Sequence, residues 1–201
     1  MLSSRSFFPA VIKIVAAVAL SAVTLCAGVP RGWYLAGSKP QDYQTGINDT
    51  QYNGRRVAFL QSVTPEPTGF GTLMQDFLAD DYAGKRVRFS AMLKTENVAD
   101  WAGIWMRIDK NMGSSSPKML VLDNMHDRPV KGTEDWKMCQ VVLDVPKDAT
   151  GIFFGLTLNG AGNVMMSDAK IETVGLDVET TAKPFPERQI PPAPTNLDFA
   201  P

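Results

Sequence analysis

One nine-residue segment concentrates the residue types best suited to recognising a ligand, Trp101-Ala-Gly-Ile-Trp-Met-Arg-Ile-Asp109. Neighbouring residues of a β-strand point to opposite sides, and successive residues on one side lie roughly 7 Å apart. One side of this segment is apolar and typical of a core, with Ala102, Ile104, Met106 and Ile108. The other side carries two indoles, a guanidinium and a carboxylate, from Trp101, Trp105, Arg107 and Asp109.

Three further segments divide in the same way. Their apolar sides are Val87, Phe89, Ala91 and Leu93, then Cys139, Val141, Leu143 and Val145, then Ile152, Phe154, Leu156 and Leu158. Their opposite sides include Arg88, Gln140 and Asn159. If these strands share a sheet, its free face combines aromatic, guanidinium and amide groups, and glycines leave room above the backbone.

Such a face suits a saccharide, because a pyranose has an apolar C–H face and hydroxyls that need fixed donors and acceptors. We expect Trp105 to stack on the ring, with Trp101 beside it. Arg107 and Arg88 would donate hydrogen bonds, and Gln140 and Asn159 would orient the hydroxyls.

Structural interpretations stay open for the same residues. Trp105 can pack under a loop, Trp101 and Trp33 can be packing residues, and Arg107 with Asp109 can form an ordinary surface ion pair. A binding face of this kind also fits a protein–protein adaptor of the cell envelope.

The polar loop from Asp123 to Asp135 is the one candidate for catalysis. It holds His126 and four carboxylates, from Asp123, Asp127, Glu134 and Asp135. Glycosidases use two carboxyl groups about 5–10 Å apart, so a glycan-acting enzyme is the lesser alternative. The sequence has no nucleophile elbow, phosphate loop or metal-ligand spacing, and its single histidine excludes multi-histidine metal sites. We therefore predict a non-enzymatic binding module.

The elements that position these residues are short β-rich segments separated by Gly, Asn, Asp and Pro. In 201 residues, 44% hydrophobic and 20% charged, they predict one all-β domain, an antiparallel β-sandwich or jelly roll. The formal charge of −1 argues against a nucleic-acid partner. The expected strands are Trp33–Gly37, Tyr43–Ile47, Arg55–Ser62, Gly69–Phe77, Arg86–Thr95, Gly103–Asp109, Lys118–Asp123, Lys137–Val145, Gly151–Asn159 and Val164–Val174. Helical spacing in Leu73–Asp81 is the weaker interpretation of that stretch.

The two ends of the chain differ from this domain. Arg5 followed by the apolar run Ile14–Cys26 is typical of a secretory signal, here 1–27, and predicts a periplasmic or extracellular protein. A lipid anchor at Cys26 and an uncleaved membrane anchor stay open. The domain then spans 28–175, with Cys139 as a small buried hydrophobe, and 176–201 is a proline-rich tail or linker.

Four motifs in order resemble those of carbohydrate-binding, galactose-binding-like jelly rolls. They are Lys85-Arg-Val-Arg-Phe-Ser-Ala-Met-Leu-Lys-Thr95, Lys131-Gly-Thr-Glu-Asp-Trp136, Leu143-Asp-Val-Pro-Lys-Asp-Ala149 and Asp168-Ala-Lys-Ile171. The resemblance implies the jelly-roll fold, and sugar binding by analogy. It also implies a structural calcium ion near Asp168, although Ser167 stands where the family often has a second aspartate. No other cofactor is implied.

A second resemblance is to small exported bacterial proteins of this kind that are often named transcriptional regulators. It is carried by Gly37-Ser-Lys-Pro-Gln-Asp-Tyr43, Trp101–Asp109 and Asp123-Asn-Met-His-Asp-Arg-Pro129. The sequence has no helix-turn-helix pattern, so such a name does not predict DNA binding here.

Overall fold

A computed structural model of the chain describes residues 28–183, 192–197 and 199. Within these ranges the chain forms nine β-strands, one 3-10 turn (Pro40–Asp42) and no α-helix. The strands are β1 (Tyr34–Gly37), β2 (Tyr43–Tyr52), β3 (Arg55–Ser62), β4 (Phe70–Leu78), β5 (Arg86–Lys110), β6 (Lys118–Asp123), β7 (Val130–Asp144), β8 (Gly151–Asn159) and β9 (Asn163–Val174). The predicted all-β antiparallel sandwich is confirmed. The same ranges contain no helix with the length and apolarity that a membrane crossing requires.

The expected strands match the observed ones with three main differences. β2 continues to Tyr52 rather than ending at Ile47. The segments Arg86–Thr95 and Gly103–Asp109 belong to one continuous strand, β5, and β7 begins at Val130 rather than at Lys137. The stretch after Leu73 is extended and not helical. Half-buried and exposed residues alternate from Gln75 to Leu78 in β4, and this period of two suits a pleated strand.

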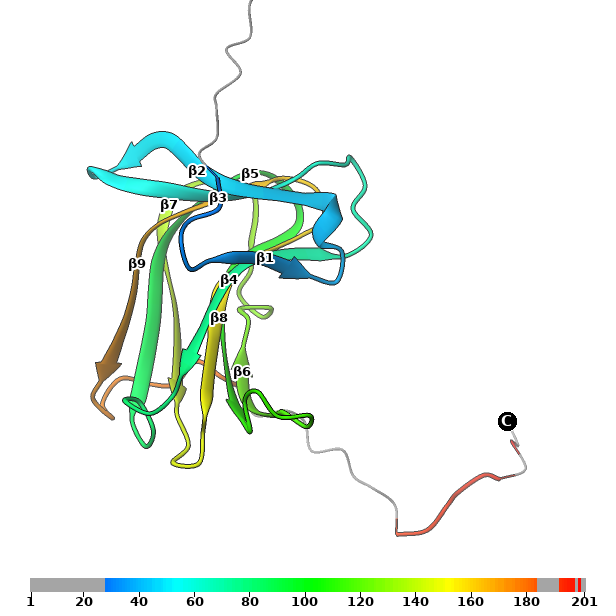
Figure 1. Ribbon diagram of the computed structural model, residues 1–201. Coiled ribbons are helices and arrows are strands. Elements are labelled where there is room, and N and C mark those ends of the chain that lie inside the picture. Colours follow the sequence, from blue (N-terminus) through cyan, green and yellow to red (C-terminus); the bar gives the residue numbers. More distant parts are fainter. Residues whose placement is uncertain (1–27, 184–191, 198, 200–201) are drawn as a thin grey trace, which may run out of the picture.

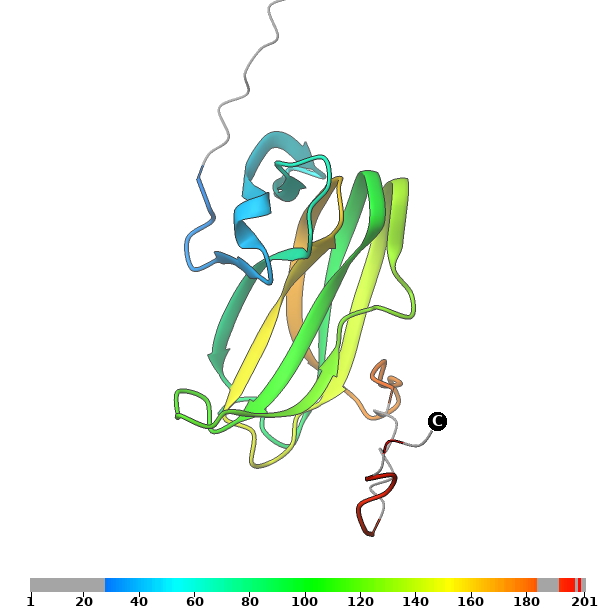
Figure 2. The ribbon, with the colours of Figure 1, turned by 90° about the vertical axis from the view of Figure 1, so that its right-hand side faces the viewer.

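Hydrogen bonding joins all the strands into one antiparallel sheet that curls into two layers, which we call layer A and layer B (Figures 1 and 2). Layer A contains β1, β4, β8, the Trp101–Lys110 half of β5, and β6, in that order. Layer B contains β2, β3, β9, the Arg86–Glu96 half of β5, and β7. β5 therefore belongs to both layers, and this decides which side chains can share a face.

The crossing of β5 between the layers is a bend at Asn97, whose φ is +54°. Glu96 is the last residue paired with β9, and Trp101 is the first paired with β8. The turn between β8 and β9 packs closely on this bend. A Cβ at Gly162, whose φ is +134°, would lie only 2.7 Å from the Val98 Cα. Glycine is therefore required there both for its backbone conformation and for the close approach.

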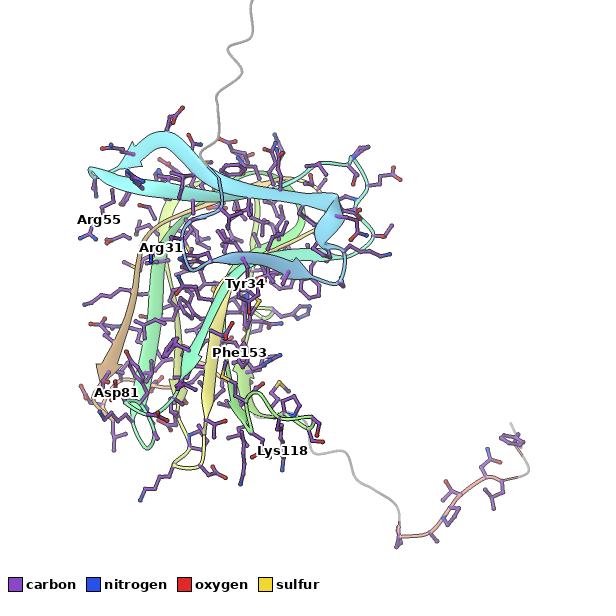
Figure 3. All side chains as sticks on the ribbon, viewed as in Figure 1. Arg31, Tyr34, Arg55, Asp81, Lys118 and Phe153 are labelled. Carbon is purple, nitrogen blue, oxygen red and sulfur yellow. The ribbon has the colours of Figure 1, made fainter. Side chains whose placement is uncertain are left out.

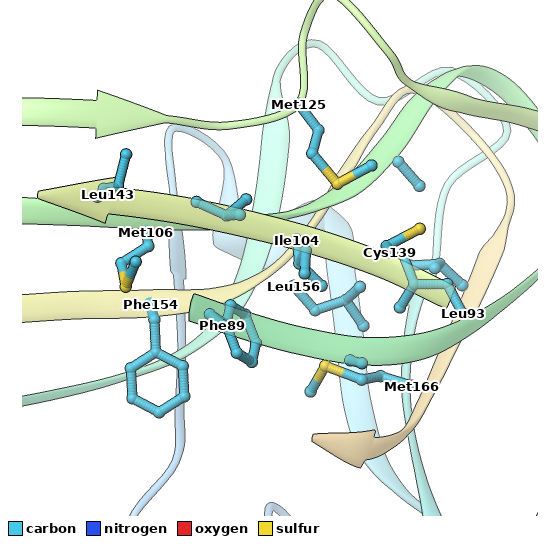
Figure 4. Close-up of a cluster of buried hydrophobic side chains, with 14 of the residues drawn as sticks. Phe89, Leu93, Ile104, Met106, Met125, Cys139, Leu143, Phe154, Leu156 and Met166 are labelled. Carbon is cyan, nitrogen blue, oxygen red and sulfur yellow. The ribbon is translucent and has the colours of Figure 1, made fainter. Parts of the chain in front are cut away.

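The hydrophobic core lies between the layers (Figure 4). The rings of Phe89 in layer B and Phe154 in layer A meet edge to face, with centroids 5.0 Å apart. All residues predicted to face inward are buried, so the alternation assigned the core correctly. Each buried Leu, Ile or Phe stabilises the fold by roughly 1.5–3 kcal/mol. Cys139 belongs to this core, and burial raises the pKa of its thiol, which fits a packing role.

Residues 176–183 lie along the free edge of β7. Thr181 donates its backbone N–H to the Val142 carbonyl, and the Thr181 hydroxyl accepts from the Val142 N–H. At the two ends of this segment, Arg86 donates to the carbonyls of Leu176 and Val178, and Lys183 pairs with Asp127. The expected signal 1–27 and the stretch 184–191 lie outside the described residues.

Candidate functional site

The outer face of layer A is a grid of side chains from four strands. Strand register places Met74, Gly155 and Trp105 in one row across β4, β8 and β5. The adjacent row holds Asp76, Phe153 and Arg107, and ends at Leu122 of β6. Trp105 and Arg107 therefore project from the same side of β5, as the sequence predicted.

Trp105 lies across β8 toward β4. Its indole Nε1–H donates to the Thr72 hydroxyl at 2.8 Å, and that hydroxyl donates to the Leu156 carbonyl at 2.9 Å. Gly155 is the register partner of Trp105 on the strand between them. Because Gly155 has no side chain, the indole can span this strand. Only 9% of Trp105 remains exposed, so it forms a floor and not a projecting platform.

Arg107 is fixed from two directions. Its Nη2 lies 2.9 Å from Asp109 Oδ2, and its Cζ lies 4.5 Å from the centroid of the Phe153 ring. The Asp109 side chain is 4% exposed and the Arg107 side chain 36%. This pair is thus half-buried, which excludes the interpretation as an ordinary surface ion pair.

These residues line a cavity of about 390 Å³ on the outer face of layer A. A volume of this size falls within the range of small-molecule sites. Most of the lining is apolar, with Arg107, Asn124, Thr72 and Thr157 supplying the polar groups. The remaining lining residues are Ala36, Gly37, Phe70, Met74, Trp101, Trp105, Met119 and Leu122.

Trp101 forms one wall of this cavity and is more exposed than Trp105. The His126 ring meets it edge to face, with centroids 5.8 Å apart. The loop carrying His126 also contributes Asn124 to the lining. The loop between β6 and β7 therefore borders the cavity rather than forming a separate site.

A tyrosine from β1 stands near Arg107. Tyr34 donates its hydroxyl to Asp76 Oδ1 at 2.6 Å. Burial, followed by the Asp76 hydrogen bond, raises the pKa of Tyr34 to about 12, and the Arg107 charge acts in the opposite direction. Tyr34 and Phe153 are labelled in Figure 3, where they lie on the same side of β4 and β8.

Two predicted site residues are not on this face. Arg88 and Gln140 belong to layer B, because Arg86–Glu96 pairs with β7 and β9. The premise that all the candidate strands share one sheet is therefore wrong. These two residues border a second groove of about 270 Å³ on the outer side of layer B. There Glu172 accepts from Arg88 at 2.6 Å, and the Lys170 and Arg88 contacts lower the pKa of Glu172.

The other predicted residues divide between the cavity and its surroundings. Asn159 pairs in register with Trp101, and its amide donates to Asp100 rather than lining the cavity. Trp33 contacts Phe154 edge to face, with centroids 5.3 Å apart, and so packs against the core.

The glycines of the face do not leave open room. A Cβ at Gly103 would lie 3.2 Å from Met125 Cβ, and one at Gly155 would lie 2.9 Å from Met74 Cβ. The space that the sequence predicted to be free is occupied by Met125 at Gly103, and by the Leu73 carbonyl and Met74 at Gly155.

The four carboxylates of the predicted loop Asp123–Asp135 all pair with cations. Only Asp127 lies in the observed loop, because Asp123 ends β6 and Glu134 and Asp135 belong to β7. Arg128 donates to both oxygens of Asp123, at 3.1 and 2.6 Å, and also to Asp127. Glu134 lies 3.8 Å from the Nζ of Lys137 on the same strand, and Asp135 lies 3.7 Å from the Nζ of Lys94 on β5. This arrangement fixes the loop and gives no carboxylate pair facing the cavity.

Asp168, the residue expected near a calcium ion, pairs with Arg55 at 3.1 Å. Calcium needs six to eight oxygen ligands, commonly several carboxylates. In the described ranges no group of three His, Cys, Asp or Glu side chains could hold a metal ion. The carboxylate set for calcium is thus not assembled at Asp168.

Sequence reasoning missed the contribution of β1, β4 and β6 to the cavity. Thr72 and Met74 alternate with the buried Leu73, a pattern that the same strand argument could have used. Nothing local in the sequence indicates that β4 and β8 are neighbours, since that pairing joins residues far apart in the chain.

A solved carbohydrate-binding module shares this fold. A family 30 carbohydrate-binding module matches with a TM-score of 0.50 and 14% identity, over 70% of this chain and 92% of that one. The C-terminal family 22 carbohydrate-binding module of Clostridium thermocellum Xyn10B gives a TM-score of 0.48 and 15% identity, over 74% and 90%. The expected likeness to carbohydrate-binding jelly rolls is confirmed at the level of the fold. No protein-family model matches the sequence.

A curated relative comes from Bacillus subtilis (strain 168) and is named "Uncharacterized HTH-type transcriptional regulator YbfP". Identity is 38% over 171 residues, which cover 84% of this chain and 56% of the relative. The chain thus spans about half the length of that protein, and the expectation of regulator names among relatives is confirmed. A helix-turn-helix consists of two helices, and the described residues of this chain include no α-helix.

Proposed function

We propose that this chain binds a saccharide non-covalently in the cavity on the outer face of layer A. The observation that carries the proposal is the composition of that cavity. Its walls are largely apolar, with two indoles, and a small number of polar groups converge on it. A sugar ring presents this same combination of an apolar C–H face and hydroxyls.

The exposure of each lining residue indicates the role that it would have in binding. Trp101 is the wall against which a ring can stack, while the nearly buried Trp105 forms the floor. Arg107 donates from one end, and Asn124 both donates and accepts from the loop. We expect weak single-site affinity, with a Kd of about 1 mM to 1 μM, which corresponds to a binding free energy of about 4–8 kcal/mol in magnitude. Arg88 and Gln140 have no part in this site.

Binding to soluble glucan, galactan, mannan and xylan tests the proposal, using affinity electrophoresis followed by calorimetry. Arg107→Met should weaken binding by about tenfold, the value of one charged hydrogen bond. Arg88→Met is the matched control, because it removes the same side chain from the opposite layer and should leave the affinity unchanged. Circular dichroism checks that both variants fold.

Two results would contradict the proposal. One is that none of the four polysaccharides binds. The other is that Arg88→Met weakens binding as much as Arg107→Met. Stoichiometric capture of an envelope protein in place of polysaccharide would support the adaptor alternative, and glycan hydrolysis would support an enzyme.

We also propose that the chain acts outside the cytoplasm. The support is the apolar run Ile14–Cys26 after Arg5. Mass spectrometry of the protein recovered from cell fractions tests this. A mature chain starting near Gly28 in the exported fraction is expected, and an intact Met1 in the cytoplasm would contradict it.

A further inference from the structure

A buried carboxylate lies directly behind the cavity residue Arg107. Asp109 is 4% exposed, and its Oδ2 pairs with Arg107 Nη2 at 2.9 Å. The Asp109 Oδ1 and the Arg107 Nε are both buried and find no hydrogen-bond partner within the described residues. Burying a carboxylate on a sheet surface is costly unless a cation compensates for it. The arrangement therefore ties Asp109 to Arg107.

The position of Arg107 depends on this carboxylate. The Phe153 ring, 4.5 Å from Cζ, holds one face of the guanidinium, and Asp109 holds one of its terminal nitrogens. The remaining exposed part of the side chain, about a third, borders the cavity. A ligand then meets a donor whose orientation is already set, which lowers the entropy cost of binding.

The positive charge of Arg107 is also neutralised by its ion pair with Asp109. Among the described residues lining the cavity, Arg107 is the sole charged side chain. Asp109 contacts it directly, and Asp76 lies in the neighbouring position of the same row, beyond Phe153. An acidic sugar would bring a third carboxylate toward one guanidinium, whereas a neutral sugar needs only the free N–H groups.

We propose that Asp109 is a positioning and specificity-determining residue, which orients Arg107 and makes the cavity select uncharged saccharides over uronates. This inference rests on the proposed saccharide site. Asp109 touches Arg107 and does not line the cavity, so it acts through that residue.

The test compares neutral gluco-, galacto- and manno-oligosaccharides with the same oligosaccharides oxidised at C6 to uronates. Calorimetry gives the ratio of neutral to uronate affinity for each protein. The wild-type chain should prefer the neutral form by about tenfold. Asp109→Asn should raise uronate affinity by about fivefold while weakening neutral binding, because the freed charge attracts the carboxylate and the orientation of Arg107 loosens.

A matched control is Asp148→Asn, which removes a carboxylate from an exposed pair with Lys110 and should leave the ratio unchanged. Arg107→Met provides an independent variant if Asp109→Asn does not fold. Without the cation, Asp109 is uncompensated, so the preference for the neutral form should increase beyond that of the wild type.

The outcomes separate the two proposals. If neither form binds the wild-type chain, both proposals fail. If the neutral form binds but Asp109→Asn weakens both ligands by the same factor, Asp109 is merely structural and this inference alone fails. A preference of the wild-type chain for uronates, or a reduced neutral preference in Arg107→Met, would also overturn it.

Discussion

Replacing Gly155 with alanine is the perturbation whose consequence the structure specifies most closely. A Cβ at this position would lie 2.4 Å from the Leu73 carbonyl oxygen and 2.9 Å from Met74 Cβ. The first of these neighbours is backbone of β4, so a side-chain rotation cannot relieve the clash. The added methyl must therefore push β4 away from β8 at this pair of residues.

The magnitude follows from what each neighbour can do. Overpacking of a close-packed site costs about 1–3 kcal/mol, and a rigid backbone neighbour places Gly155→Ala near about 3 kcal/mol. At Gly103 the closest atom to an added Cβ is Met125 Cβ, at 3.2 Å, and the other neighbours lie at ordinary contact distances of 3.6 and 3.7 Å. Alanine also loses less chain entropy on folding than glycine, so the net cost there should be about 0–1 kcal/mol. Gly28→Ala meets no atom within 4 Å and should stay within about 0.5 kcal/mol of wild type.

Urea unfolding of the three variants gives the free energy of unfolding from the midpoint at constant m-value. The order of destabilisation should be Gly155→Ala, then Gly103→Ala, then Gly28→Ala. If Gly155→Ala is as stable as the wild-type chain, the backbone of β4 does not approach Gly155 as closely as described. A larger loss in Gly103→Ala than in Gly155→Ala would refute the reasoning about rigid and yielding neighbours.

Two other predictions concern the polar contacts of the same face. Thr72→Val removes the acceptor of the Trp105 indole N–H and should destabilise the fold by about 1–3 kcal/mol in urea unfolding, with a change under 0.5 kcal/mol contradicting the contact. Tyr34 should ionise near pH 12, because burial and Asp76 favour the neutral phenol, as measured by the absorbance difference between wild type and Tyr34→Phe. Because folding raises the Tyr34 pKa from 10.0, the neutral phenol of Tyr34 stabilises the folded state. This stabilisation is complete below pH 10 and is lost as the pH rises toward 12. Asp76→Asn should lower the Tyr34 pKa, and an unchanged titration would show that the hydrogen bond does not form in solution.

The fold was predictable because strand alternation is a local property. Residues such as Phe89, Ile104 and Leu156 repeat every second position, and each lies in the core as expected. Alternation assigns a residue to the inner or outer side of its strand. It does not reveal which layer of a sandwich the strand occupies.

The candidate site was predictable in part for the same reason. Trp101, Trp105 and Arg107 stayed together because they belong to one half of β5. Arg88 lies on the same strand and also faces outward, but the bend at Asn97 carries its half of β5 into the other layer. Whether a long extended segment crosses between layers depends on pairing with distant strands, which single-residue patterns do not encode.

The low exposure of the Trp105 side chain could not be predicted from the sequence either. An indole on the outer side of a strand can stand free or lie flat, and the outcome depends on what the neighbouring strand offers. Here the register partner of Trp105 is Gly155, which has no side chain, and Thr72 accepts the indole hydrogen bond. Neither residue is adjacent to Trp105 in the sequence.

The four indole N–H signals of the chain test the central claim most directly, because they report on both layers in a single NMR spectrum. Titration with the tightest-binding neutral oligosaccharide should shift the signals of Trp101 and Trp105, with one common saturation curve. The signals of Trp33, packed against the core, and of Trp136, beside Tyr52 with ring centroids 4.6 Å apart, should stay in place. Saturable binding that moves Trp136 and leaves Trp101 and Trp105 unshifted would place the saccharide on layer B and contradict the account.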